Sequence, residues 1–201
     1  MAYRFVLASA SPARLATLRA AGVEPEVVVS GVDEDEVRAD TTADLVLRLA
    51  ELKASAVAAQ STAPALVLGC DSMLELDGRA LGKPGTPAAA RERWRDMRGR
   101  TAALHTGHCL IDVGAGRRAS RSVATEVRFA DVTDDEIEAY CATGEPLAVA
   151  GAFTIDGLGG WFVEGVTGDH HNVVGVSLPA VRAMLRELGH GLRDIDYPAR
   201  Q

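Results

Sequence analysis

The 201-residue sequence has few aromatic side chains and no excess of basic charge. Aromatic residues make up 4% of the chain, and the formal net charge is −7. Few aromatic rings argue against a platform that stacks nucleic-acid bases, and an acidic chain argues against a broad surface for a phosphate backbone. A local basic pocket for a phosphorylated small molecule is still compatible with this balance. We therefore expect no nucleic-acid partner.

Long apolar runs and clustered cysteines are also absent from the sequence. No stretch approaches the roughly 18 uninterrupted apolar residues of a membrane-spanning helix, and the N-terminus has no secretory pattern. The three cysteines, Cys70, Cys109 and Cys141, lie far apart and form no C-x-x-C pair. We interpret them as buried thiols in a reducing compartment. These absences predict a soluble cytoplasmic protein with no membrane partner.

Segments typical of strands and of helices alternate along the chain, which indicates an α/β fold. Hydrophobic residues make up 47% of the sequence, which excludes a disordered chain. The run from Ala65 to Cys70 is typical of a central strand, and Asp77-Gly78 predicts a hairpin turn. Spacing and capping signals predict helices at residues 13–21, 42–59, 86–97, 133–141 and 177–188, the fourth with a capping box. The glycine-rich segment 151–168 is expected to alternate short strands with turns.

The first candidate site lies where an apolar strand meets a helix near the N-terminus. Residues 3–8 are followed by Ser9 and Ser11, and Pro12 suits the first helical turn, where its missing N–H costs nothing. Ser11 is a good N-cap, and Arg14 then lies on the first turn. Free N–H groups, the helix dipole and a guanidinium would converge on an anion there. The alternative is an ordinary strand-to-helix connection with a capping serine.

Two acidic residues are candidates for metal binding and proton transfer. Asp71 follows the apolar run 65–70, and open α/β sheets place ligand groups at the carboxyl ends of their strands. It could hold a divalent cation or take a proton from water, or it could simply begin a turn. Glu34 lies in an acidic run that is otherwise a solvated loop, and we expect it to bind a metal only together with Asp71.

Two lysines are candidates for phosphate contacts. The predicted helix 42–59 has one apolar face, which is formed by Leu45, Leu49, Leu52 and Ala56. Lys53 lies off that face, so it either reaches a phosphate or faces water. Gly82-Lys83-Pro84 is not a Walker motif, because that motif needs four residues between its glycines and a Ser or Thr after the lysine. Lys83 therefore extends from the end of the hairpin, or is an ordinary surface lysine.

Short motifs follow one another in a specific order over nearly the whole chain. They are Leu7-Ala8-Ser9-x-Ser11-Pro12-x-Arg14, Val32-Asp33-Glu34, Lys53-Ala54, Gly69-x-Asp71-Ser72, Gly82-Lys83-Pro84, Leu104-His105-Thr106-Gly107, Ala150-Gly151-Ala152-Phe153, Gly157-Leu158-Gly159-Gly160 and Asn172-Val173-Val174-Gly175. This pattern resembles the Maf family of nucleoside triphosphate pyrophosphatases.

The resemblance implies an α/β fold of the inosine-triphosphatase type, with a mixed, twisted sheet, flanking helices and two lobes around a central cleft. It implies one domain over residues 1–190 and often a homodimer, and the polar residues 191–201 are expected to form a loose tail. It also implies hydrolysis of a nucleoside triphosphate to the monophosphate and pyrophosphate with Mg²⁺ or Mn²⁺. The implied roles are Asp71 as catalytic proton acceptor, Glu34 and Asp71 as metal ligands, and Ser9, Ser11, Arg14, Lys53 and Lys83 as phosphate contacts.

Three positions bear on the choice of base within this family, namely Ala13, Ser72 and Asp156. The branch resembling dTTP/UTP hydrolases has arginine, threonine and glutamine there, and the 7-methyl-GTP branch has tryptophan, glutamine and glutamate. Ser72 is nearer to the first branch and Asp156 to the second, whereas Ala13 fits neither. An aspartate only accepts hydrogen bonds, which favours a base edge with donors such as guanine. The sequence leaves the base undecided.

Two other functions compete with a house-cleaning enzyme that removes unwanted or modified nucleotides. One is a nucleotide-binding regulator of cell division and septum formation, in which hydrolysis is absent or incidental. The other is a pyrophosphatase for 7-methyl-GTP, which differs only in the base pocket. The combined presence of Glu34, Lys53, Asp71 and Lys83 favours an enzyme, because a protein that only binds nucleotides has little need for a base.

Overall fold

The computed structural model describes residues 3–61 and 64–195, which form a seven-stranded mixed sheet. The strand order is β2-β1-β3-β5-β6-β7, with β4 also paired to β3. β1 is parallel to β2 and to β3, and the other neighbours are antiparallel. The strands are β1 Arg4–Leu7, β2 Glu26–Val27, β3 Ala65–Leu76, β4 Arg79–Leu81, β5 Thr101–Asp112, β6 Arg117–Phe129 and β7 Val163–Thr167. The prediction of a mixed α/β fold is confirmed.

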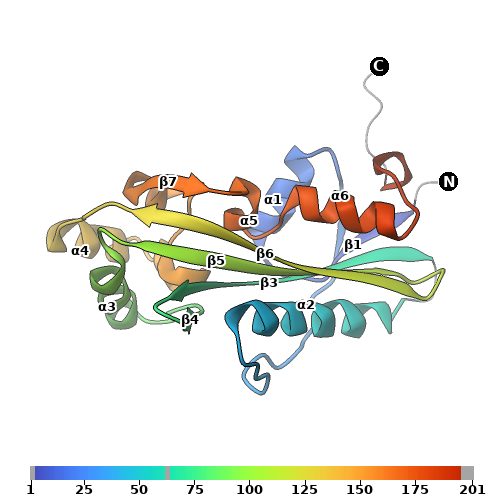
Figure 1. Ribbon diagram of the computed structural model, residues 1–201, viewed down its shortest axis with the longest axis horizontal. Helices are drawn as coiled ribbons and strands as arrows, with labels where there is room; N and C mark the ends of the chain where they lie inside the picture. Colours follow the sequence, from blue (N-terminus) through green and yellow to red (C-terminus); the bar gives the residue numbers. More distant parts are fainter. Residues whose placement is uncertain (1–2, 62–63, 196–201) are drawn as a thin grey trace.

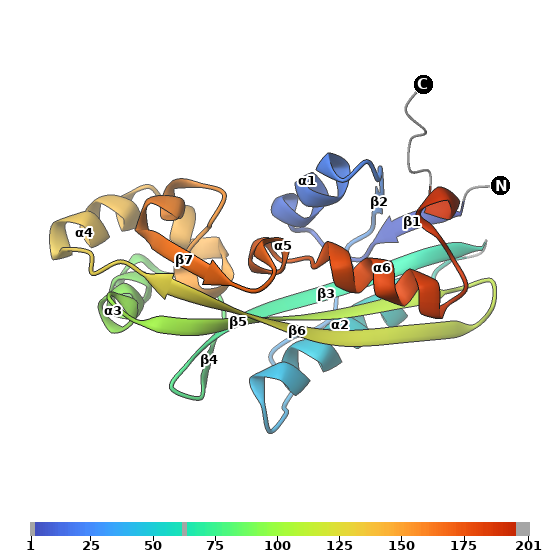
Figure 2. The ribbon, with the colours of Figure 1, turned by 45° about the horizontal axis from the view of Figure 1, so that its top comes forward.

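Helices cover both faces of this sheet. α2 lies on one face, whereas α1, α5 and α6 lie on the other (Figure 1). α3 and α4 pack together at one end of the long strands β3, β5 and β6 (Figure 2). The helices are α1 Pro12–Ala20, α2 Thr42–Ala58, α3 Pro87–Met97, α4 Asp134–Ala142, α5 His170–Val174 and α6 Leu178–Glu187.

Five of the helices begin and end within one residue of their predicted bounds, because local capping signals fix them. The side-chain oxygens of the five N-caps each accept a hydrogen bond from the backbone N–H three residues later. These N-caps are Ser11, Thr41, Thr86, Thr133 and Ser177. At α4, Glu136 also bonds back to the Thr133 backbone, which completes the predicted capping box.

Two large hydrophobic clusters give the molecule two lobes that share the long strands. One cluster contains Leu74, Trp94 and Phe129 and packs α3 and α4 against one end of the sheet. The other contains Leu18, Leu68 and Met184 and packs α1 and α6 against the other end. On β3, the boundary between the two clusters falls between Cys70 and Leu74.

The edge of β3 is open where the two lobes meet. β1 pairs with Ala65–Leu68, and β4 pairs with Leu74–Leu76. Between them, residues 69–73 pair only with β5 among the described strands. The predicted strand 65–70 was therefore too short, because pairing with β5 carries β3 on to Leu76. Asp71 lies within the strand, at the gap in its edge, and not after the strand.

The buried face of α2 differs from the predicted one by about one residue step around the helix. Leu52 is 44% exposed, whereas Lys53 is 8% exposed. The physical reason is close packing of α2 on two glycines of the sheet. A Cβ on Gly69 would lie 2.3 Å from the carbonyl oxygen of Ala50, and one on Gly107 would lie 2.1 Å from that of Val46. Small residues therefore face the sheet, and the larger leucine points outward.

Three other regions complete the comparison with the sequence. The segment 151–168 contains the 3-10 helices η2 at Ala150–Ala152 and η3 at Leu158–Phe162 and contributes one strand, β7, so the expected series of short strands was wrong. Within the stretch predicted as a tail, Leu192–Ile195 form the 3-10 helix η4 and Ile195 is buried. Residues 196–201 lie outside the described residues. In residues 3–61 and 64–195, no helix is long and apolar enough to cross a membrane.

Candidate active site

Arg14 is bound by protein acceptors on the α1 face of β3. Its side chain comes from the first turn of α1, and it is only 9% exposed. Nε donates to the Gly175 carbonyl at 2.8 Å, and Nη1 donates to Ser9 Oγ at 3.0 Å and to the Cys70 carbonyl at 2.9 Å. Nη2 donates to Ser72 Oγ at 3.0 Å. Four of the five guanidinium N–H groups are thus used inside the protein, and one is left for a ligand.

The hydroxyl of Ser72 is fixed by a chain of hydrogen bonds that crosses two strands. Thr106 Oγ1 lies 2.9 Å from Ser72 Oγ and donates to the Asn172 carbonyl at 3.0 Å. Because a hydroxyl has one hydrogen, Ser72 must be the donor to Thr106. Ser72 therefore accepts from Arg14, donates to Thr106, and has no hydrogen left for a nucleotide base.

Lys53 joins two carboxylates on the opposite face of β3. Successive side chains of a strand alternate between faces, so Asp71 points toward α2 while Ser72 points toward α1. Lys53 Nζ lies 2.6 Å from Asp71 Oδ1 and 2.7 Å from Glu34 Oε1. Lys53 and Asp71 are buried, whereas the Glu34 side chain is 44% exposed. The structure therefore brings together Glu34, Lys53 and Asp71 as the sequence predicted. Of the two alternatives left open for Lys53, the one in which it simply faces water was wrong, because its side chain is buried on the face of α2 that packs on the sheet.

The environments of the two carboxylates shift their pKa values in opposite directions. Burial raises the pKa of Asp71 above its ordinary value, against the opposing charges of Lys53 and Arg14. Partial burial also pushes the pKa of Glu34 upward, but the hydrogen bond and charge of Lys53, with the charges of Lys83 and Arg14, hold it below its ordinary value. Asp71 is therefore the better proton acceptor of the two, and Glu34 stays ionised.

The two ends of the gap in β3 carry the remaining predicted phosphate contacts. Ser9 and Ser11 follow β1 at one end, where Ser9 Oγ accepts from the Ser11 backbone and Ser11 Oγ caps α1. Lys83 follows β4 at the other end and is exposed. Its charge helps to lower the pKa of Glu34, so it acts on the same site.

The side chains of the three predicted base-specificity residues make no hydrogen bond or ion pair with one another. Ala13 is half-buried on α1, and Ser72 belongs to the hydrogen-bond chain described above. Asp156 is exposed in the turn between η2 and η3, and its side chain makes no hydrogen bond or ion pair with any described residue.

Thr106, Asn172 and Gly175 contribute contacts that the sequence did not reveal. Each belongs to a motif of the family pattern, but nothing in its local sequence assigns it a partner. The one usable signal is Gly175, which follows α5 with φ +119° and so holds its carbonyl toward Arg14 in a conformation that favours glycine.

The chemistry of the two carboxylates suits a divalent cation that is held jointly with a phosphorylated ligand. Asp71 Oδ2 is buried and has no hydrogen-bond partner among the described residues. No group of three or more His, Cys, Asp or Glu side chains in residues 3–61 and 64–195 has the arrangement of a metal site. Magnesium is commonly held by one or two carboxylates together with substrate phosphates, so a two-carboxylate set suits that mode. Glu34 and Asp71 are the residues that would hold the metal.

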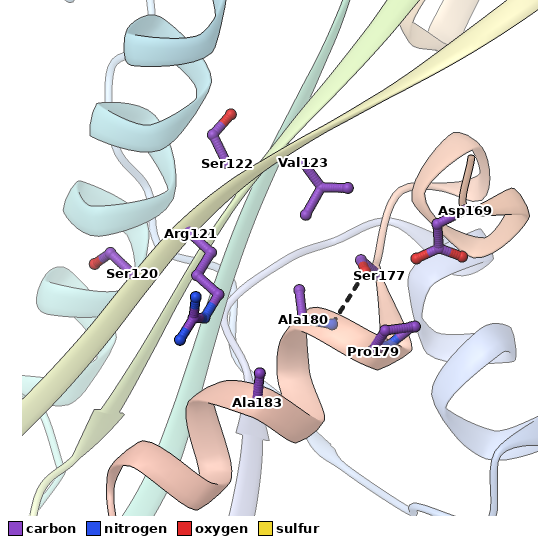
Figure 3. A pocket seen from close by; sticks show the side chains of 9 residues that line it. All are labelled: Ser120, Arg121, Ser122, Val123, Asp169, Ser177, Pro179, Ala180 and Ala183. Atoms are coloured by element: carbon purple, nitrogen blue, oxygen red, sulfur yellow. Dashed lines mark hydrogen bonds between the residues drawn. The ribbon is translucent and has the colours of Figure 1, made fainter. Parts of the chain in front are cut away.

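A separate pocket of about 600 Å³ lies on the α6 side of the sheet. Its walls are Ser120–Val123 of β6, Asp169, and Ser177, Pro179, Ala180 and Ala183 at the start of α6 (Figure 3). None of the predicted site residues lines it. The candidate site is instead the open edge of β3 between Arg14 and Lys53.

Comparisons with known proteins agree with the motif pattern. The family described as Maf-like protein matches residues 4–188. A relative from Streptomyces coelicolor named nucleoside triphosphate pyrophosphatase is 57% identical over 98% of this chain and 96% of its own length. A relative of the same name from Salinispora tropica is 60% identical over 92% of this chain and 84% of its own length.

Similarity to solved structures is partial. The Staphylococcus aureus Ham1 protein aligns with a TM-score of 0.43 and 17% identity over 64% of this chain and 72% of its own. A Coxiella burnetii HAM1 protein aligns with a TM-score of 0.42 and 21% identity over 65% and 74%. The family is therefore assigned from the sequence matches, which span most of this chain and of its relatives. They show that the protein belongs to the Maf family.

Proposed function

We propose that the protein hydrolyses a nucleoside triphosphate to the monophosphate and pyrophosphate. The observation that carries this proposal is the state of Asp71 at the open edge of β3. One carboxylate oxygen is bound by Lys53 at 2.6 Å, and the other is buried and makes no hydrogen bond with residues 3–61 or 64–195. A buried carboxylate with a raised pKa and a free oxygen is suited to take a proton from water. The names of the relatives from Streptomyces coelicolor and Salinispora tropica support the same reaction.

The groups around Asp71 suit a polyphosphate chain. The N-terminus of α1, capped by Ser11, follows Ser9 at one end of the gap, Arg14 binds the Cys70 carbonyl and Ser72 Oγ within it, and Lys83 follows β4 at the other end. These groups would bind the phosphates and stabilise the charge that develops on the leaving pyrophosphate. Asp71 Oδ2 would accept the proton of the water that attacks the α-phosphorus. A bound Mg²⁺ or Mn²⁺ would supply charge neutralisation on the phosphates.

We also propose a cellular location and an oligomeric state for the protein. We infer a cytoplasmic enzyme with a single domain over residues 1–190, and a homodimer, which is frequent in the family that the sequence resembles. Size-exclusion chromatography with light scattering measures the assembly, and a monomer at micromolar concentration would contradict this part of the proposal.

The reaction is tested by the products that the purified protein releases. The protein is incubated with a panel of nucleoside triphosphates that includes dTTP, UTP and 7-methyl-GTP, in the presence of Mg²⁺ or Mn²⁺. Release of pyrophosphate and the monophosphate supports the proposal. Release of single inorganic phosphate, or tight nucleotide binding without turnover, would contradict it, and the second outcome would favour a nucleotide-binding regulator of division. The preferred nucleotide in the panel also identifies the base.

A further inference from the structure

Lys53 occupies the space between the two carboxylates of the site. Its ammonium group lies 2.6 Å from Asp71 Oδ1 and 2.7 Å from Glu34 Oε1, and its side chain is 10% exposed. Two of its three N–H donors are therefore used on the carboxylates, and its charge offsets one of their two negative charges.

The choice of lysine at this position stands out against the composition. The chain has 21 lysines and arginines, yet only two of them are lysines, and both Lys53 and Lys83 act on Glu34. Arginine holds fixed acceptors through a planar fork, whereas lysine is a compact charge on a flexible stem that can change partners. Arg14 shows the first behaviour in this protein, with four bonds to neutral acceptors.

The position of the ammonium group has a consequence for cation binding. A divalent cation and an ammonium group repel each other when both lie against the same partly buried pair of carboxylates, because their like charges are then close together and only partly screened. A cation therefore has to displace Lys53. A polyphosphate offers Lys53 a new anionic partner and lowers the cost of that displacement.

We propose that Lys53 is a tethered counter-ion that keeps Glu34 and Asp71 from divalent cations until a polyphosphate takes over its ammonium group. This inference rests on the proposed function for the identity of the ligand. It makes cation binding conditional on the phosphate chain, so that the free protein binds Mg²⁺ or Mn²⁺ weakly. By linkage, the cation and the polyphosphate strengthen each other's binding.

The test measures Mn²⁺ binding without nucleotide, by electron paramagnetic resonance of free Mn²⁺. Lys53→Met removes the ammonium group but keeps an unbranched side chain, and we expect it to bind Mn²⁺ about tenfold or more tightly than the native protein. Lys83→Met is the matched control, because it removes the other lysine charge near Glu34 without touching a carboxylate. We expect a change of about twofold or less for this exposed charge. Equal effects of the two variants, or no gain with Lys53→Met, would overturn the inference.

A second measurement uses the native protein and does not depend on the folding of a variant. Labelling with [¹³Cε]lysine gives two signals, because the chain has two lysines. We expect the signal of the buried Lys53 to stay in place with Mg²⁺ alone and to shift with Mg²⁺ and imidodiphosphate together. A shift with Mg²⁺ alone, or no shift with both, would overturn the inference.

These results are independent of turnover. A protein that shows the gain in Mn²⁺ binding but releases no pyrophosphate would reject the proposed reaction and keep Lys53 as a counter-ion. A protein that releases pyrophosphate but shows no gain would reject the role of Lys53 alone.

Discussion

The two faces of β3 hold buried cations in different ways. On the α1 face, Arg14 is bound by carbonyl and hydroxyl oxygens that carry no charge. On the α2 face, Lys53 is bound by the carboxylates of Asp71 and Glu34. Both side chains are nearly inaccessible to solvent, so burial alone does not distinguish them.

The difference lies in what each cation would leave behind if it moved. Withdrawal of Arg14 would break four hydrogen bonds to acceptors in three parts of the chain, which is costly in a buried place. Withdrawal of Lys53 would leave two carboxylates that a metal ion can take over. Arg14 is therefore a fixed part of the fold, and Lys53 is exchangeable. The fixed Arg14 thus lies on one face of β3 and the exchangeable Lys53 on the other.

Asp71→Asn changes the carboxylate that Lys53 binds, and we expect it to have the largest effect of the four substitutions described below. Asparagine keeps the shape and one acceptor for Lys53 but cannot take up a proton. We expect kcat to fall about 10³-fold, as for loss of a general base, while triphosphate binding is retained. Pyrophosphate release and isothermal titration calorimetry measure the two quantities. Turnover equal to that of the native protein would remove Asp71 from the reaction.

Arg14→Lys sharpens the comparison, because it keeps the positive charge and removes the planar fork. Lysine has three donors on one atom and cannot reach acceptors on α5, β3 and the Ser9 loop together. We expect the free energy of unfolding to fall by about 2–4 kcal/mol, measured by urea denaturation. Arg19→Lys, at an exposed surface ion pair with Glu24, is the matched control and should change stability little. Equal stability of the two variants would show that Arg14 is no fixed support.

Thr106→Val tests the hydrogen-bond chain behind the fixed support. Valine has nearly the same shape but removes the hydroxyl between Ser72 Oγ and the Asn172 carbonyl. We expect a loss of about 1–2 kcal/mol in unfolding free energy from the unpaired groups. Mn²⁺ binding to the Lys53 face should stay unchanged, since Thr106 touches only the other side. A changed Mn²⁺ affinity would mean that the two faces are coupled.

Asp112→Asn has the smallest expected effect and tests a hydrogen bond between a carboxylate and a histidine ring that lies away from the site. Asp112 Oδ2 lies 2.8 Å from His190 Nε2 near the C-terminal end of the described chain. Burial pushes the pKa of Asp112 up, but hydrogen bonds from His190 and the Ala115 backbone outweigh it and lower the pKa.

A lowered pKa in the folded state gives stability that is present above the ordinary pKa of about 4 and is lost as the pH falls through the folded value. The Asn variant should therefore lose about 1 kcal/mol at pH 7 and show a smaller further loss between pH 5 and pH 3. Thermal unfolding across this pH range measures both. If the stability of the variant falls between pH 5 and pH 3 as steeply as that of the native protein, the role of this carboxylate is contradicted.

Local signals predicted more of the fold than of the site. The N-cap at Ser11, the capping box at Thr133 and the hairpin at Asp77-Gly78 were predicted correctly, because each depends on residues within a few positions of one another. The orientation of α2 was wrong because spacing ranks large apolar residues above small ones. Close contacts at Gly69 and Gly107 reversed that ranking, and they lie on strands that the sequence of α2 does not contain.

The sequence by itself determined which residues could carry the chemistry, because Glu34, Lys53, Asp71 and Lys83 are the right types in a specific order. Tertiary structure decided how each is used. Arg14 finds the Gly175 carbonyl 161 residues away, and Lys53 meets Asp71 only because α2 packs closely on the glycines of β3 and β5. The fixed cation, Arg14, and the exchangeable cation, Lys53, differ in their acceptors. Packing across the sheet brings those acceptors together, and no local sequence pattern does so.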